Sequence, residues 1–106
     1  MTVLRIFRRH SMNIGFECSG HSGYGEAGTD IVCAAISTAA QFCVQCGERI
    51  DHIQADFIED PARAMIRCVA KKPNVSFSAH IDILKELGET ISKDYSDFFN
   101  LEIVEV

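Results

Sequence analysis

The sequence contains no uninterrupted apolar run that approaches the ~20 residues needed to cross a bilayer. Its N-terminus, MTVLRIFRRH, has too short an apolar part for a secretory signal peptide. It also lacks internal repeats and linker-like stretches between its elements. These absences predict a single domain over residues 1–106, located in the cytoplasm and without a membrane partner.

The sequence also lacks a disulfide framework and an excess of positive charge. Its five cysteines are an odd number and lie inside apolar patterns, which favours free thiols in a reducing cytosol. The formal net charge of −5 argues against a surface built to bind phosphate backbones, so we expect no direct binding of nucleic acid. An acidic surface suits a basic polypeptide partner, although solubility alone also accounts for it.

What is present is an ordinary globular composition with clear periodicity. The 106 residues are 47% hydrophobic and 24% charged, enough for a core without disulfides or metal. Alternating and helical patterns predict strands at residues 3–8 and 12–18, a helix at 31–46, strands at 53–57 and 64–68, a helix at 76–95 and a strand at 101–106. This order, β-β-α-β-β-α-β, predicts an α+β fold. Its mostly antiparallel sheet would carry two long helices, in two layers or as a sandwich.

The first helix carries a predicted core stripe from which one cysteine is displaced. Apolar residues at steps of three and four make up the stripe: Val32, Ala35, Ile36, Ala39, Phe42, Cys43 and Cys46. Gly47 is expected to follow the end of this helix. Cys33 lies off the stripe, with Ser37 one turn further and Ala40 and Val44 beyond it. A displaced cysteine at a helix start suggests reactivity, although free cysteine is often simply buried.

A glycine-rich loop precedes that helix. Gly20, Gly23, Gly25 and Gly28 are four of the seven glycines, and such a loop can bend sharply and lie close to a ligand. Asp30 is placed to cap the helix with its carboxylate. A cysteine in the first turn of a helix faces free amides and the positive end of the helix dipole, both of which favour a thiolate.

His21 precedes Cys33 by twelve residues across this loop. Together they supply a base and a nucleophile, the pair that cysteine-based peptide hydrolysis needs. Free N–H groups at the helix start are the candidate oxyanion donors. This chemistry requires no cofactor and no metal.

The same residues resemble a known family. GHSGY at residues 20–24 and GTDIVCAAIS at residues 28–37 are similar to the signature of the ribosomal-processing cysteine proteases, the Prp family. The resemblance implies a bacterial cysteine endopeptidase that removes the N-terminal extension of a large-subunit ribosomal protein, a basic precursor. It further implies that Cys33 is the nucleophile, that His21 is the base, and that the enzyme is a homodimer.

Several roles around this pair stay open. Asp30 either caps the helix only or also orients His21, and Gly20 and Ser37 are supporting residues. Tyr24 either seats an apolar substrate side chain or is an ordinary loop aromatic. Together with three glycines it would form a flexible substrate loop: Gly23, Tyr24, Gly25 and Gly28.

Two other functions compete with the protease. The first is a non-catalytic, ribosome-associated module that binds a polypeptide and keeps the motif for structural reasons. The second is a zinc or redox protein that uses Cys43 and Cys46, which have C-x-x-C spacing. Both of these cysteines lie on the predicted buried stripe and no second pair follows, so we expect them to be small core residues.

Overall fold

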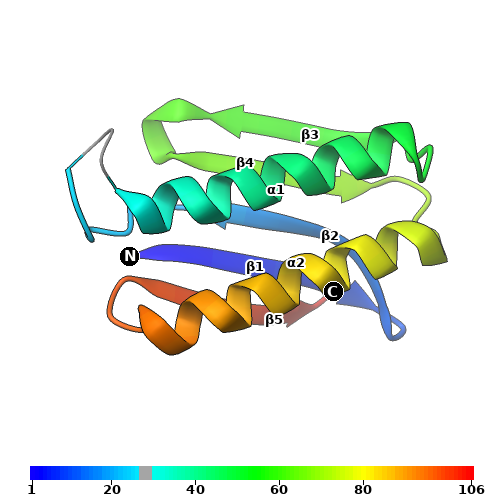
Figure 1. Cartoon of the computed structure of the whole chain (residues 1–106). Helices are drawn as coiled ribbons and strands as arrows, with labels where there is room; N and C mark the ends of the chain where they lie inside the picture. The colour runs from blue at the N-terminus through cyan, green and yellow to red at the C-terminus, as the bar shows by residue number, and fades with distance from the viewer. Residues whose placement is uncertain (27–29) are drawn as a thin grey trace.

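The computed structural model describes residues 1–26 and 30–106. Five strands, two long helices and one short 3₁₀ turn alternate in the expected order (Figure 1). In chain order they are β1 (Thr2–Arg9), β2 (Met12–Ser19), α1 (Ile31–Arg49), β3 (Ala55–Asp60), η1 (Pro61–Arg63), β4 (Met65–Ala70), α2 (Val75–Asp94) and β5 (Phe99–Glu105). The predicted α+β class and element order are therefore confirmed.

The sheet has the strand order β3-β4-β2-β1-β5. Neighbouring strands run antiparallel except β5, which lies parallel to β1 with Thr2 opposite Phe99. The first and last strands of the chain are therefore neighbours. β3, at one edge, is exposed over most of its length.

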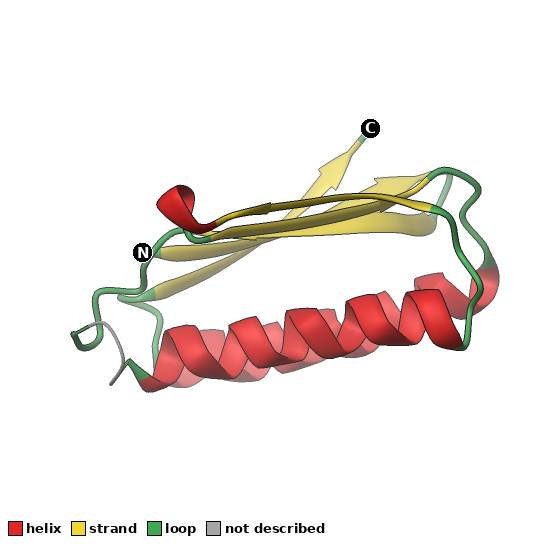
Figure 2. Ribbon diagram, turned by 90° about the horizontal axis from the view of Figure 1, so that it is seen from above, coloured by secondary structure: helices red, strands yellow, loops and turns green. Residues whose placement is uncertain are grey.

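Both helices cover one face of this sheet, so the domain has two layers (Figure 2). The other face carries polar pairs, among them Arg5, which bridges Glu17 at 3.3 Å and Glu102 at 3.0 Å. By length and composition alone α1 could cross a membrane. Here it packs on the sheet through Val32 and Ile36, and the core helix of a globular domain can be equally long and apolar.

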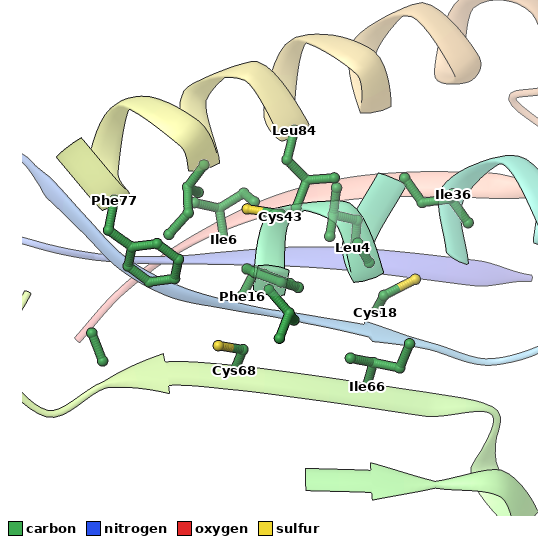
Figure 3. Packing of buried hydrophobic residues seen from close by; sticks show 14 of the residues in the cluster. Leu4, Ile6, Phe16, Cys18, Ile36, Cys43, Ile66, Cys68, Phe77 and Leu84 are labelled. Atoms are coloured by element: carbon green, nitrogen blue, oxygen red, sulfur yellow. The ribbon is translucent and has the colours of Figure 1, made fainter. Parts of the chain in front are cut away.

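The core lies between the helices and the central strands (Figure 3). Leu4, Ile6 and Phe16 on the sheet face Ile36 of α1 and Leu84 of α2, and all five are at most 2% exposed. Alternate residues along β1 point to the helices, as the alternating sequence pattern predicts. Packing of this apolar face fixes the helices, and hence the N-terminus of α1, against β2.

The predicted end of α1 is wrong. The helix continues past Gly47 to Arg49, and the backbone N–H of Ile50 closes it on the carbonyl of Cys46 at 2.9 Å. Gly47 is a packing residue, because an added Cβ would lie 2.8 Å from Phe77 Cε1 and 2.9 Å from Ile53 Cδ1. The glycine allows α1 and α2 to approach closely, so it marks a contact and not a stop.

The predicted stripe of α1 is also partly wrong. Phe42 is 71% exposed and Ala35 is exposed as well, whereas Ala40 and Val44 are buried. The buried face of α1 lies on the sheet, and α2 covers only part of the adjoining face, which carries Phe42. Residue type alone does not reveal which apolar residues of α1 are buried and which are exposed.

The remaining boundaries shift by a few residues. Ile53 is buried but precedes β3, and its N–H donates to the carbonyl of Gly47 at 3.0 Å. The strand runs on to Asp60, where a turn had been expected, and Asp60 then caps the 3₁₀ turn.

Candidate active site

The β1–β2 hairpin delivers Gly20 and His21 to the N-terminal end of α1. Gly20 has a φ of +88°, and an added Cβ would lie 2.5 Å from the carbonyl oxygen of Met1, so this position requires glycine. Its N–H donates to the carbonyl of Arg63 at 3.2 Å, and its own carbonyl accepts the Thr2 hydroxyl at 3.0 Å. Gly20 is therefore anchored to two distant parts of the chain.

Asp30 is the N-cap of α1, as the sequence indicates. Its Oδ1 accepts a hydrogen bond from the Cys33 N–H at 2.9 Å. Its Oδ2 accepts the hydroxyl of Ser22 and, at 3.3 Å, the N–H of Gly25. The bond from Cys33, followed by that from Ser22, lowers the pKa of Asp30 below its ordinary value of 3.8. The carboxylate is thus held in its charged form.

His21 and Cys33 line one open cavity of about 510 Å³ beside the start of α1. Asp30 and Ser37 line it too, together with Gly23, Gly25 and Ala34. His21 is exposed and Cys33 is half-buried, so solvent or a ligand reaches both. The structure therefore brings together the candidate base His21, the candidate nucleophile Cys33, the cap Asp30 and the supporting Ser37. Gly28 lies outside the described residues.

Cys33 and Ser37 also border a second cavity, of about 140 Å³. Its lining also includes the end of β3, with Glu59 and Asp60, and the start of β4, with Met65. Cys33 and Ser37 therefore line both cavities.

Tyr24 packs edge-on against two aromatic rings at the end of α2. Its ring centroid lies 5.3 Å from that of Tyr95 and 5.3 Å from that of Phe98. Such pairs contribute about 0.5–1.5 kcal/mol beyond their burial. Tyr24 thereby ties the glycine loop to the α2–β5 connection, a structural role that leaves its part in substrate binding open.

The other four cysteines are buried in the core. Burial raises the pKa of Cys18 and of Cys43 to about 12, and that of Cys68 to about 11. The expectation that Cys43 and Cys46 are small core residues is confirmed. Over residues 1–26 and 30–106, no group of three or more His, Cys, Asp or Glu side chains is arranged to hold a metal ion.

Two points at the site differ from the sequence interpretation. The N–H of Cys33 is occupied by Asp30, and the N–H of Ala34 donates to the Asp30 carbonyl at 3.0 Å, so neither is a free oxyanion donor. Ser22, 3% exposed and bonded to Asp30, was not singled out. Its signal was present, since it follows His21 directly inside the motif. The anchor at Thr2 had no local signal.

A cysteine at a capped helix start, with a histidine on the same cavity, defines the class of cysteine peptidases. The chain belongs to the cysteine protease Prp family, whose model matches residues 1–100. The predicted recognition and enzyme class, a cysteine protease that hydrolyses peptide bonds, are thereby confirmed. No curated protein matches the sequence significantly.

Solved structures share the fold at low sequence identity. The ribosomal processing protease Prp from S. aureus, in complex with a covalently linked product peptide, matches with a TM-score of 0.89 and 20% identity. That match covers 98% of this chain and 100% of the other. The same protease with a substrate peptide gives 0.84 and 19%, with the same coverage. SMU.848 from Streptococcus mutans gives 0.84 and 21%, covering 100% of this chain and 96% of the other.

Proposed function

We propose that this protease removes the N-terminal extension of a large-subunit ribosomal protein, with Cys33 as nucleophile and His21 as base. The observation that carries the proposal is the shared cavity, which places both side chains at the open end of α1. The S. aureus structures with substrate and product peptides support a peptide substrate for this fold.

The reaction follows from the two side chains. His21 takes the thiol proton of Cys33, and the thiolate attacks the scissile carbonyl to give a tetrahedral intermediate. The imidazolium then donates that proton to the leaving amine, which departs and leaves an acyl-enzyme. Water, deprotonated by His21, hydrolyses the thioester and regenerates the thiol. Asp30 keeps Cys33 at the helix start by bonding its N–H.

The surroundings of Cys33 fit a basic polypeptide. Glu59 and Asp60 line the smaller cavity together with the apolar Met65 and Ile66, and the Asp60 carboxylate also pairs with Arg63 at 3.6 Å. The formal net charge of −5 favours encounter with a positively charged precursor. A cytoplasmic location in bacteria and the lack of direct binding to nucleic acid complete this proposal.

The decisive experiment incubates the protein with the precursor of the ribosomal protein and follows cleavage by mass spectrometry. Cys33→Ala should abolish cleavage, and His21→Ala should slow it about 10²–10⁴-fold, the usual contribution of a general base. His10→Ala is the matched control, since His10 is exposed in the turn at the other end of the hairpin. Cleavage by the Cys33→Ala protein would show that the nucleophile is assigned wrongly.

The non-catalytic module makes the opposite prediction. A binding module would hold the precursor without cutting it, and Cys33→Ala would leave its affinity unchanged. Binding of the wild type without any product over a long incubation would therefore favour the module.

We also propose a homodimer, supported by an apolar groove of about 320 Å³ between the outer faces of α1 and α2. Phe42, Ile83 and Leu87 border it and are 71%, 55% and 47% exposed. Sedimentation of the wild type should show a dimer that Phe42→Glu dissociates, while Val75→Glu, at a similarly exposed site outside the groove, leaves it intact. A monomeric wild type would contradict the proposal.

A further inference from the structure

His21 lies between two residues that are both anchored. On one side, Gly20 is held by its bonds to Arg63 and Thr2. On the other side, Ser22 is 3% exposed although its neighbours in the loop are exposed, and its hydroxyl donates to the carboxylate of Asp30. The backbone of His21 is therefore fixed at both ends, and the residue is exposed on the wall of the cavity.

Asp30 connects the Ser22 anchor to the nucleophile. One carboxylate oxygen accepts the Ser22 hydroxyl, and the other accepts the N–H of Cys33 at 2.9 Å. A single charged group thus joins the segment that carries His21 to the helix turn that carries Cys33. Hydrogen bonds to an ionised carboxylate are stronger than those between neutral groups, so this link is firm.

We propose that Ser22 is a positioning residue that holds His21 toward Cys33 through its hydrogen bond to Asp30. The proposal rests on the proposed function for the roles of His21 and Cys33. Asp30 then acts on His21 through the neighbouring serine, in addition to capping α1. From the sequence, Asp30 either only capped α1 or also oriented His21. In this proposal it does both, one carboxylate oxygen bonding the Cys33 N–H and the other the Ser22 hydroxyl.

The hydroxyl of Ser22 is the group that matters. It donates to Asp30 and accepts the N–H of Tyr24 at 3.2 Å. The hydroxyl therefore joins the segment from Ser22 to Tyr24 both to itself and to the N-cap of α1. The Ser22→Ala substitution removes both hydrogen bonds and changes the size of the side chain very little. A side chain without a hydroxyl leaves the segment held through Gly20, through Tyr24 and through the longer 3.3 Å bond from the Gly25 N–H to Asp30, and the imidazole then samples a wider range of positions.

The test compares Ser22→Ala with Asp30→Asn and with the double variant. The asparagine introduced by Asp30→Asn can still accept the Cys33 N–H through its amide oxygen, so the cap is kept, but its NH₂ group can only donate toward Ser22 Oγ, so the bond from the hydroxyl to a charged acceptor is replaced by a weaker neutral one. Ser76→Ala is the matched control. Ser76 also donates its hydroxyl to an aspartate, Asp51, but beyond the other end of α1, which at 19 residues is about 28 Å long.

Two readouts separate positioning from general stability. The first is the pH dependence of Cys33 alkylation by iodoacetamide in the folded protein, and the second is kcat and KM for cleavage of the precursor. Ser22→Ala should lower kcat about 10- to 100-fold with KM within about twofold, because a misplacement of about 1 Å can cost roughly 10²-fold. Its alkylation profile should move toward that of His21→Ala.

The double variant should lose less than the sum of the two single losses, because both changes act on the same link between Ser22 and Asp30. Ser76→Ala should match the wild type in both readouts. A wild-type kcat and alkylation profile in Ser22→Ala would overturn the proposal, as would fully additive losses in the double variant.

The proposal and the proposed function fail in different ways. If the wild type does not cleave the precursor, the proposed substrate is wrong, and the alkylation profile alone decides the role of Ser22. If His21→Ala leaves the Cys33 profile unchanged, there is no effect for Ser22 to transmit and positioning is overturned, whatever the substrate.

Discussion

Cys18 and Cys33 line the same small cavity beside α1, yet Cys18 is 5% exposed and Cys33 is half-buried and also open to the larger cavity. Burial, with a smaller contribution from the neighbouring Cys33 thiol, raises the pKa of Cys18 to about 12. Two thiols that line one cavity therefore differ in their exposure, and only Cys33 lies at the start of α1.

Alkylation of the folded protein should therefore modify Cys33 alone. The thiolate is the reactive form, and a thiol with a pKa near 12 stays protonated between about pH 5 and about pH 9. Iodoacetamide labelling followed by peptide mapping measures this directly. Labelling of Cys18, Cys43 or Cys68 at a comparable rate before unfolding would contradict the burial of these thiols.

Replacing Asp30 by alanine should lower stability in a pH-dependent way. The pKa of Asp30 is lowered in the folded state, so its stabilising contribution is present above the unfolded value of about 3.8. It is lost as the pH falls through the lower, folded pKa. Urea unfolding at pH 7 should separate wild type from Asp30→Ala, and the difference should shrink below about pH 3.8. A difference that grows toward low pH would contradict the sign of the shift.

Gly15 should tolerate no side chain. An added Cβ would lie 2.5 Å from the carbonyl oxygen of Cys68 and 2.7 Å from Cα of Val69, both backbone atoms of β4. Gly15→Ala should therefore destabilise the protein by about 1–3 kcal/mol or more, since β2 and β4 must move apart. Gly88→Ala is the matched control, because its nearest neighbour is a side-chain atom, Leu4 Cδ2 at 3.2 Å. Equal unfolding midpoints in urea for both variants would contradict this interpretation.

Asp51 should matter for stability and not for the active site. Its side chain is fully buried, accepts the Ser76 hydroxyl and lies 2.7 Å from His80 Nδ1. Asp51→Ala leaves both partners without this acceptor, which costs about 1–3 kcal/mol. The loss should appear in urea unfolding, while the alkylation profile of Cys33 stays that of the wild type. A changed profile would show that the two ends of α1 are coupled.

The local features of the fold could be predicted because they rest on local periodicity and capping. The first two strands, both helices and the Asp30 cap each follow from residues that are close together in the sequence. Gly47 could not be placed correctly, since a glycine that ends a helix and one that admits a neighbouring Phe77 look alike in sequence. The exposure of Phe42 depends on how much of α1 the second helix covers, a property of the assembled layer.

At the site, the motif predicted that His21 and Cys33 act together, and both line one cavity, but the motif did not show which contacts hold them in place. Ser22 resembles any small loop residue until its hydroxyl is seen against Asp30. Thr2 and Arg63, which hold Gly20, are distant in the chain and carry no motif of their own.

The pairing of the first strand with the last governs how the chain folds. Thr2 lies opposite Phe99, and its N–H donates to the carbonyl of Phe98 at 3.0 Å, so β1 gains β5 as a neighbour only when residues 99–105 are present. Topologies dominated by such distant contacts fold slowly, in milliseconds to seconds. The same Thr2 fixes Gly20, so we expect a nascent or truncated chain to carry the histidine and the cysteine without holding them together. Proteolytic competence is therefore expected only once β5 is in place.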